Sequence, residues 1–117
     1  MTPSQTARIR ELNDQFRKTG DGGRVFLTRG IIALPSYQML QVIEAVRAFD
    51  AFTPDNDPHG EHDFGAVTIE GNKVFWKIDY YQPNIDGELD VDGPGSEDPS
   101  DPEGTIRLMT IMLAEEY

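Results

Sequence analysis

Apolar residues recur at helical spacing near the start of the chain. Ile9, Leu12 and Phe16 follow one another at three- and four-residue intervals, with charged residues between them, which is typical of a thin amphipathic helix. Thr2 can cap the start of this helix, because its hydroxyl can accept a hydrogen bond from a free backbone N–H of the first turn. We therefore predict a helix that begins after Thr2 and ends near Lys18, before a glycine-rich break.

A broader apolar face predicts a second helix further along the chain. A short strand is predicted before it, at Arg24–Thr28. Pro35-Ser36 then favours a helix start, and the helix is expected to run to about Asp50. Its apolar positions return every three or four residues; they are Met39, Leu40, Val42, Ile43, Val46 and Phe49.

A β-hairpin is predicted from two runs of β-branched and aromatic residues, Phe64–Glu70 and Lys73–Tyr81. The dipeptide Gly71-Asn72 between them suits a tight two-residue turn, which fixes the register. The expected pairs are Glu70 with Lys73, Ile69 with Val74, and Val67 with Trp76. The expected core-facing residues are Val67, Ile69, Val74, Trp76, Ile78 and Tyr80.

The segment 82–104 has no hydrophobic periodicity. It holds four prolines, four glycines and eight acidic residues, without any Lys or Arg, so we predict a long loop or a locally disordered segment. Thr105–Leu113 is apolar again. Its β-branched residues favour a strand buried on both faces, although its Leu and Met residues would also suit a helix.

These elements predict an α+β fold. Consecutive strands with helices gathered before them indicate a small antiparallel sheet, built from the hairpin and from strands on its N- and C-terminal sides. Two helices are expected to cover one face of this sheet. The 117 residues fit one domain, residues 1–117, because two independent cores would be hard to build from so short a chain.

Charge is unevenly distributed along the sequence. Residues 1–50 carry seven basic and five acidic side chains, whereas residues 51–117 carry three basic and sixteen acidic ones. The net charge of −11 disfavours direct contact with nucleic acid or an anionic membrane and favours cations or basic protein surfaces. The absence of cysteine excludes thiol catalysis and Cys-based zinc sites. Without a long apolar run or a signal peptide, we expect a cytoplasmic location.

A dense group of possible metal ligands lies in the predicted loop 53–63. His59, Glu61, His62 and Asp63 are the metal-ligand candidates, since imidazole with carboxylate suits a divalent transition metal. The spacing matches no known metal motif. A loop whose Asp and His side chains bond to their own backbone is the more ordinary interpretation, and we favour it.

Asp79 is the alternative catalytic candidate. It is predicted to share a strand face with Lys77, and if that face were covered, burial could shift its pKa towards acid–base work. A solvent-side ion pair with Lys77 is the favoured interpretation. The glycines at 20–23 follow a helix and open a strand, which is the reverse of a phosphate loop.

The acidic residues of segment 82–104 permit two interpretations. A solvated, self-repelling loop is the ordinary one. The alternative is a partner-binding surface that mimics nucleic-acid phosphates and docks on the basic groove of a DNA- or RNA-handling protein. The candidate partner-binding residues are Asp86, Glu88, Asp90, Asp92, Glu97, Asp98, Asp101 and Glu103.

Four segments, at residues 8–14, 49–65, 75–81 and 108–117, resemble a bacterial family known only as domain of unknown function 3768. The resemblance covers nearly the whole chain and implies no activity, cofactor or site residue. Members of the family are similar to the small accessory proteins of plasmids and integrated elements. The resemblance therefore implies an origin on a mobile element and a role against, or alongside, host defence.

Two classes of function stay open on the sequence alone. The first is a non-enzymatic interaction protein that acts through its acidic surface, in its most concrete form an inhibitor of a host nucleic-acid-binding complex. The second is a metal-binding domain or metal-dependent enzyme built on the 55–63 residues, with Asp79 as its base. We favour the first, because the excess negative charge is better matched to a basic partner than the loop spacing is to a metal.

Overall fold

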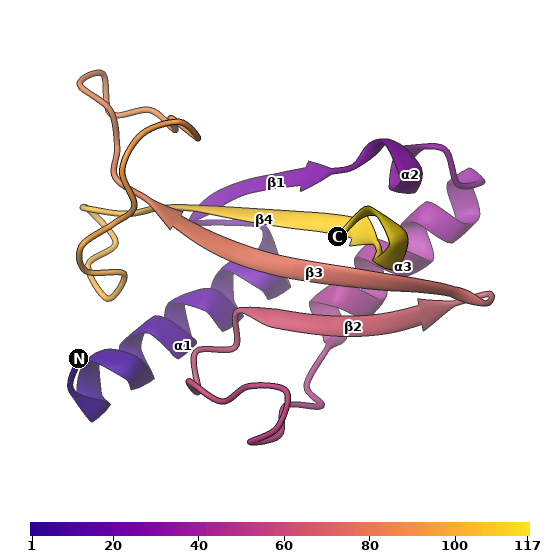
Figure 1. Ribbon diagram of the computed structural model, residues 1–117, viewed down its shortest axis with the longest axis horizontal. Helices are drawn as coiled ribbons and strands as arrows, with labels where there is room; N and C mark the ends of the chain where they lie inside the picture. Colours follow the sequence, from indigo (N-terminus) through magenta and orange to yellow (C-terminus); the bar gives the residue numbers. More distant parts are fainter.

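The computed structural model describes all 117 residues and shows an α+β fold (Figure 1). Three helices, four strands and a C-terminal helical turn follow one another along the chain. In order, they are α1 (Pro3–Thr19), β1 (Gly23–Leu27), α2 (Arg29–Ile32), α3 (Ser36–Ala48), β2 (Phe64–Ile69), β3 (Asn72–Tyr81), β4 (Ile106–Leu113) and η1 (Ala114–Glu116). The predicted helices and strands are all present, and Thr105–Leu113 forms a strand rather than a helix.

Local capping explains where α1 begins and ends. The Thr2 hydroxyl accepts from the Gln5 N–H at 3.1 Å, as predicted for the cap, and the Gln5 side chain accepts from the Thr2 N–H at 2.9 Å, which completes a capping box. Gly20 ends the helix in the left-handed region, with φ of 80°, and its N–H donates to the Phe16 carbonyl. Helix α2 was not predicted; it is a single turn that buries Ile31 completely.

The four strands form one mixed sheet in the order β1-β4-β3-β2. Strands β2, β3 and β4 form the predicted antiparallel part, but β1 pairs with β4 in parallel. The expectation of a wholly antiparallel sheet was wrong, because it ignored the helices between β1 and β2. The chain crosses the sheet in α3 and re-enters running in the same direction as β1, so β4 also runs parallel to β1.

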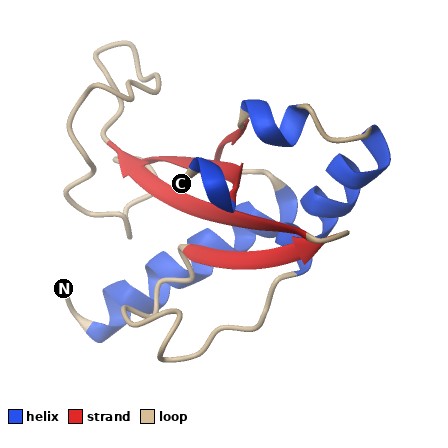
Figure 2. Ribbon diagram, turned by 45° about the vertical axis from the view of Figure 1, so that its right-hand side comes forward, coloured by secondary structure: helices blue, strands red, loops and turns tan.

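Both long helices cover the same face of the sheet, as predicted, and the C-terminal turn lies on the other (Figure 2). Between helices and sheet lies a single core, in which Trp76 is the largest side chain and is fully buried. Leu40, predicted to face this core, is instead 58 % exposed. The buried cluster consists of Phe16, Ile31, Val42, Val46, Val74, Trp76, Ile78, Met109 and Ile111.

The hairpin turn lies one residue earlier in the chain than predicted. Glu70 and Gly71 form the turn, with φ of 50° and 82°, so Thr68 pairs with Lys73 and Val67 pairs with Val74. Each β2 residue therefore pairs two positions earlier on β3 than predicted. Because side chains alternate with a period of two, the same residues still face the core. The new register places Gly65 opposite Trp76. A glycine leaves room for the indole ring, where the predicted valine would have crowded it.

Gly65→Ala is expected to lower the free energy of unfolding by about 1–3 kcal/mol, since it overfills a packed core. A β-carbon at Gly65 would lie 2.5 Å from the Trp76 Nε1 atom. Urea denaturation measures the loss, and Thr68→Ala on the exposed face of β2 is the control, with little expected change. Combining Gly65→Ala with Trp76→Phe should recover part of the loss; a strictly additive double variant would contradict the steric explanation.

Candidate functional site

A fully buried asparagine connects the main elements of the polar interior. Asn13 on α1 donates through Nδ2 to the Glu61 carbonyl oxygen at 3.0 Å and to the Tyr80 hydroxyl at 2.8 Å. Its Oδ1 accepts from Arg107 Nε at 2.6 Å. One side chain therefore holds α1, the loop before β2 and two neighbouring strands together, and all of its hydrogen-bonding atoms are used.

Tyr80 and Arg107 extend this network towards the end of the sheet. The Tyr80 hydroxyl donates to Glu61 Oε1 at 2.7 Å, and burial, followed by this hydrogen bond, raises the pKa of Tyr80 far above its ordinary value. Tyr80 is therefore a neutral donor here, not a base. The Arg107 guanidinium lies over the Tyr80 ring, 5.2 Å from its centroid, and burial lowers the pKa of Arg107.

Arg107 has no carboxylate partner, although it is only 2 % exposed. Besides Asn13, it donates to the Pro99 carbonyl oxygen at 2.6 Å. Pro99 belongs to the acidic segment 82–104. The buried guanidinium therefore joins this segment to α1, through its hydrogen bonds to Pro99 and Asn13.

His62 is held in an unusual backbone conformation by contacts on several sides. Its φ is 54°, a left-handed value that is uncommon outside glycine. Its ring stacks on Phe52 with centroids 3.7 Å apart, and its Nδ1 lies 2.8 Å from Asp14 Oδ1. Asp57 accepts from the His62 N–H at 3.2 Å, and Asp14 also accepts from Arg17 Nη1 at 2.9 Å. The loop is thereby clamped to α1.

The four predicted metal ligands lie near one another but have different partners. Glu61 accepts from Tyr80, and both ring nitrogens of His62 lie within 4 Å of carboxylate oxygens of Asp14 and Asp57. His59 is exposed in a shallow, open depression of about 370 Å³. No group of three or more His, Cys, Asp or Glu side chains is arranged to hold a metal ion. Within the loop, the Asp57 carboxylate accepts from the His62 backbone N–H, whereas the His62 ring contacts Asp14 on α1.

Asp63 precedes β2 and is half-buried. Burial, together with the neighbouring charge of Glu61, raises the pKa of the Asp63 carboxyl above its ordinary value. The folded state then binds this proton more tightly than the unfolded state does. The Asp63 contribution to stability is therefore most favourable below the unfolded pKa of 3.8 and is lost as the pH rises through the higher folded value.

Asp63→Asn is expected to raise the free energy of unfolding at neutral pH, because the amide carries no charge to desolvate. The gain over wild type should shrink as the pH falls towards 3.8. Denaturation curves at several pH values measure it, with Asp55→Asn in the exposed part of the same loop as the control. A gain that does not depend on pH would show that the carboxyl pKa is not its cause.

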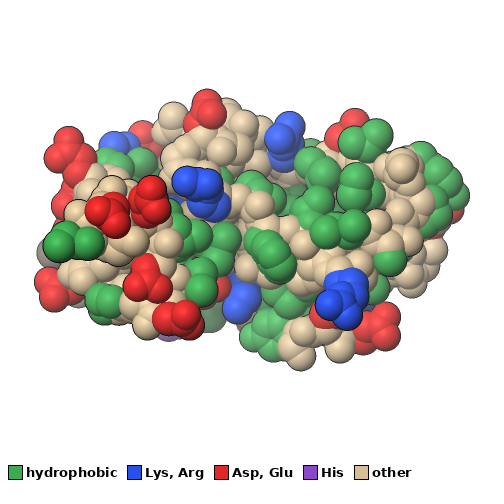
Figure 3. Space-filling model, turned by 90° about the horizontal axis from the view of Figure 1, so that it is seen from above, with side chains coloured by type: hydrophobic (Ala, Val, Ile, Leu, Met, Phe, Trp, Pro, Cys, Tyr) green, Lys and Arg blue, Asp and Glu red, His purple; other side chains and the backbone are tan.

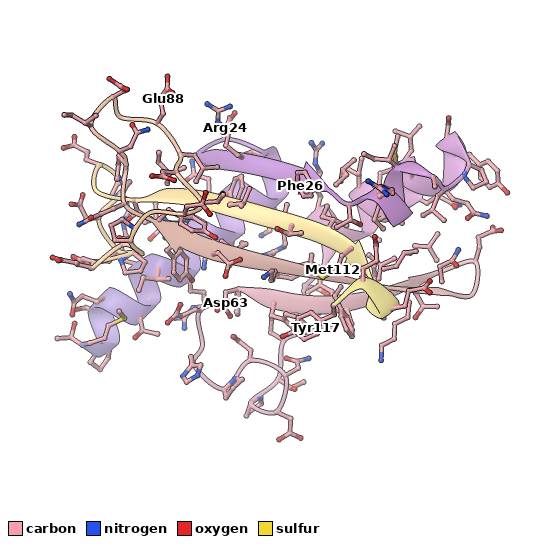
Figure 4. The ribbon with its side chains drawn as sticks, turned by 45° about the horizontal axis from the view of Figure 1, so that its top comes forward. Arg24, Phe26, Asp63, Glu88, Met112 and Tyr117 are labelled. Carbon is pink, nitrogen blue, oxygen red and sulfur yellow. The ribbon has the colours of Figure 1, made fainter.

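Asp79 lies on the open face of the sheet, away from the helices. Its side chain is 42 % exposed and pairs with Lys77 at 3.3 Å. The sheet face around Asp79 is therefore not covered, and its carboxyl is not buried. Figure 4 shows Met112 and Tyr117 on this same face, where the Tyr117 ring packs edge-on against Phe75.

We call residues 82–104 the acidic arm. Its inner part, 94–104, is fixed to the sheet: the Gln82 N–H donates to the Pro94 carbonyl at 3.0 Å, and the Ser96 and Thr105 hydroxyls lie 2.6 Å apart. Asp98 uses its carboxylate to accept from the Ser100 N–H at 3.1 Å. The inner acidic residues thus help to fold the arm. The segment is a long loop, as predicted, and side-chain caps hold its turns without any hydrophobic periodicity.

The outer arm, residues 82–93, projects from the end of the sheet (Figure 1). Asn84 Oδ1 accepts from two backbone N–H groups, of Asp86 and Glu88, both at 2.9 Å. None of the ion pairs in the structure involves the arm. Figure 3 shows acidic side chains gathered at this end of the molecule, and Figure 4 shows Glu88 at the outer rim of the arm. The exposed outer-arm carboxylates are Asp86, Glu88, Asp90 and Asp92.

Three polar residues that organise the interior, Asn13, Arg17 and Arg107, were not predicted from the sequence. Asn13 and Arg17 lie four residues apart on the helix face that also carries Ile9 and Phe16, and all four are buried. A polar residue within an apolar stripe was the available signal. Arg107 gave the same signal, as the one charged residue within an apolar strand.

None of the helices combines the length and apolar character that a bilayer span requires. Searches of curated proteins and of solved structures gave no match. The family model described as "Protein of unknown function (DUF3768)" matches residues 27–116, which include the clamped loop and the whole acidic arm and leave out α1. Since this match covers most of the 117 residues, the chain belongs to the DUF3768 family.

Proposed function

We propose that this protein is a non-enzymatic interaction protein that binds a basic protein surface through its acidic arm. The observation that carries the proposal is the set of four exposed outer-arm carboxylates, which have no cationic partner within the chain. Like charges held close together repel one another, and a basic partner would relieve that repulsion. The arm is ordered by its own turns, so binding would cost little conformational entropy.

Two aliphatic side chains on the outer arm support a protein partner over a simple cation. Ile85 is 100 % exposed and Val91 is 56 % exposed. A calcium or magnesium ion gains nothing from such groups, because its ligands are oxygen atoms. A protein surface can bury an aliphatic side chain within a rim of charge pairs, which is the usual anatomy of an interface.

The partner we propose is a nucleic-acid-handling protein, which the arm would inhibit by occupying its phosphate-binding groove. Such a groove is lined with Lys and Arg to neutralise a phosphate backbone. A narrow projection with regularly recurring carboxylates presents charge of the same sign. An origin on a mobile element, and a target in host defence, are the parts of this proposal that the family resemblance motivates.

Capture from a native lysate of the organism that encodes the chain tests the proposal. Immobilised wild type should retain a basic protein at low salt and release it at high salt, and a DNA oligonucleotide should compete for that protein. The test variant changes the four outer-arm residues to amides, Asp86→Asn, Glu88→Gln, Asp90→Asn and Asp92→Asn. Asparagine keeps the side-chain oxygen with which Asp90 accepts from the Asp92 N–H.

The control variant removes the same number of charges elsewhere on the exposed surface. It carries Asp21→Asn, Glu44→Gln, Asp50→Asn and Glu115→Gln, all of which are exposed. The proposal expects the control to retain the partner and the outer-arm variant to lose it. If both variants retain the partner equally, the arm is not the binding element. If a partner resists oligonucleotide competition, the nucleic-acid-mimic part of the proposal is wrong.

A further inference from the structure

A second feature suited to ligand binding is a pocket whose lining includes no residue of the acidic arm. A pocket of about 240 Å³ opens between the end of α1, the α3 helix and strands β1 and β4. Most of its wall is aliphatic or thioether surface, with no acidic side chain in the lining. The apolar lining residues are Val25, Leu27, Ile43, Val46, Met109 and Ile111.

Two guanidinium groups complete the wall of this pocket, those of Arg17 and Arg47. Arg47, in the last turn of α3, is exposed and forms no ion pair. Arg17 is 1 % exposed, and its Nη atoms donate to Asp14 and to the Phe49 carbonyl oxygen. Its Nε–H has no partner. An unsatisfied buried donor is uncommon, because leaving one unpaired costs about 1–3 kcal/mol.

The charged side chains of this pocket are opposite in sign to the net charge of the molecule. The chain carries a net charge of −11, and its acidic excess lies in residues 51–117, yet this wall carries cationic groups only. An apolar cavity with an unpaired guanidinium at its rim is complementary to an amphipathic anion. The carboxylate would face Arg47, which can bind it by two parallel hydrogen bonds, and the alkyl chain would lie against the apolar wall.

Pocket size limits the length of such a ligand. An apolar cavity of about 150 Å³ holds benzene, with its six carbons, so one of about 240 Å³ holds about ten non-hydrogen atoms by the same ratio. A straight-chain carboxylate of that size is octanoate. We propose that this pocket binds a medium-chain aliphatic carboxylate, with Arg47 as the residue that recognises the carboxylate.

Calorimetric titration of the full chain with sodium octanoate tests this inference, with octan-1-ol and octylamine as chain-matched comparisons. Octanoate should bind about tenfold more tightly than the alcohol, since a charge-assisted hydrogen bond is about twice as strong as a neutral one. Octylamine should bind most weakly, because Arg47 repels it. In methyl NMR spectra, octanoate should shift the signals of Val25, Ile43 and Met109.

Arg47→Gln should lower the octanoate affinity about tenfold and leave the octanol affinity unchanged. Arg24→Gln is the control. Arg24 is exposed and directly precedes the lining residue Val25 on β1, but it does not itself line the pocket. The inference is overturned if octanoate binds no more tightly than octanol, if Arg47→Gln binds octanoate as wild type does, or if the shifted methyl groups lie elsewhere. The arm plays no part in this test, so its result is independent of the proposed function.

Discussion

Asn13→Leu is expected to lower the free energy of unfolding by about 3–5 kcal/mol, the largest stability effect that a single polar substitution should produce in this protein. Leucine has a similar volume but forms no hydrogen bond. The change would leave Arg107 Nε and the Glu61 carbonyl oxygen without their Asn13 partner at a fully buried site, and the Tyr80 hydroxyl would keep only its hydrogen bond to Glu61 Oε1. A domain of this size has only about 5–15 kcal/mol of stability in total.

Thermal and urea denaturation measure this loss, and Gln15→Leu is the matched control. Gln15 lies on the exposed side of the same helix, so the same amide-to-leucine change should cost less than about 0.5 kcal/mol there. Amide hydrogen exchange should also become faster in the inner arm, which Arg107 fixes through Pro99. A loss below about 1 kcal/mol for Asn13→Leu would show that the network contributes little.

Neutralising the four outer-arm carboxylates is expected to lower the affinity for a captured basic partner about hundredfold at low salt. Each exposed charge pair contributes about 0.2–1 kcal/mol, and four such pairs together approach the 2.7 kcal/mol that a hundredfold change requires. The fold should survive, because the four side chains are exposed and form no ion pair. Calorimetry with the purified partner measures the change.

The control variant, in which four exposed carboxylates outside the arm are changed to amides, separates an effect of the arm from an effect of net charge. It has the same net charge as the outer-arm variant but keeps the arm intact. If net charge alone mattered, both variants would lose affinity equally. If the arm is the binding element, the control variant should bind within about threefold of wild type, because charges farther than a Debye length of about 10 Å from the interface are screened.

Helices and strands were predictable because their buried faces are apolar. Ile9 and Phe16 in α1, and Val42 and Val46 in α3, are all buried at the spacing that predicted them. The hairpin faces followed from alternation in the same way. These patterns result from burial against a single core, which leaves a periodic signal in the sequence.

The register and the strand direction depend on contacts between segments, and a local pattern does not contain them. Gly71-Asn72 is a good turn sequence, but the turn forms at Glu70-Gly71 because Trp76 needs the glycine at position 65 across from it. The parallel pairing of β1 with β4 is set by the crossover through α3, which joins parts of the chain that lie far apart in sequence.

The candidate site was only partly predictable for a related reason. The excess negative charge of the arm is a property of composition, so the position of the arm could be predicted from the sequence. The division of the arm into an inner part, whose Asp98 caps a turn, and an outer part, whose exposed carboxylates form no ion pair, depends on contacts between side chains and backbone. The network of Asn13, Tyr80 and Arg107 joins three segments, and no single segment shows it.

The salt dependence of partner binding tests the central claim most directly. The affinities of wild type and of the outer-arm variant are measured from about 50 to 500 mM salt, a range over which exposed charge pairs become screened. We predict that the wild-type affinity falls steeply with salt, that the variant affinity falls much less, and that the two converge at high salt. Two parallel lines, with equal slopes for wild type and variant, would contradict the proposal that the acidic arm binds the partner.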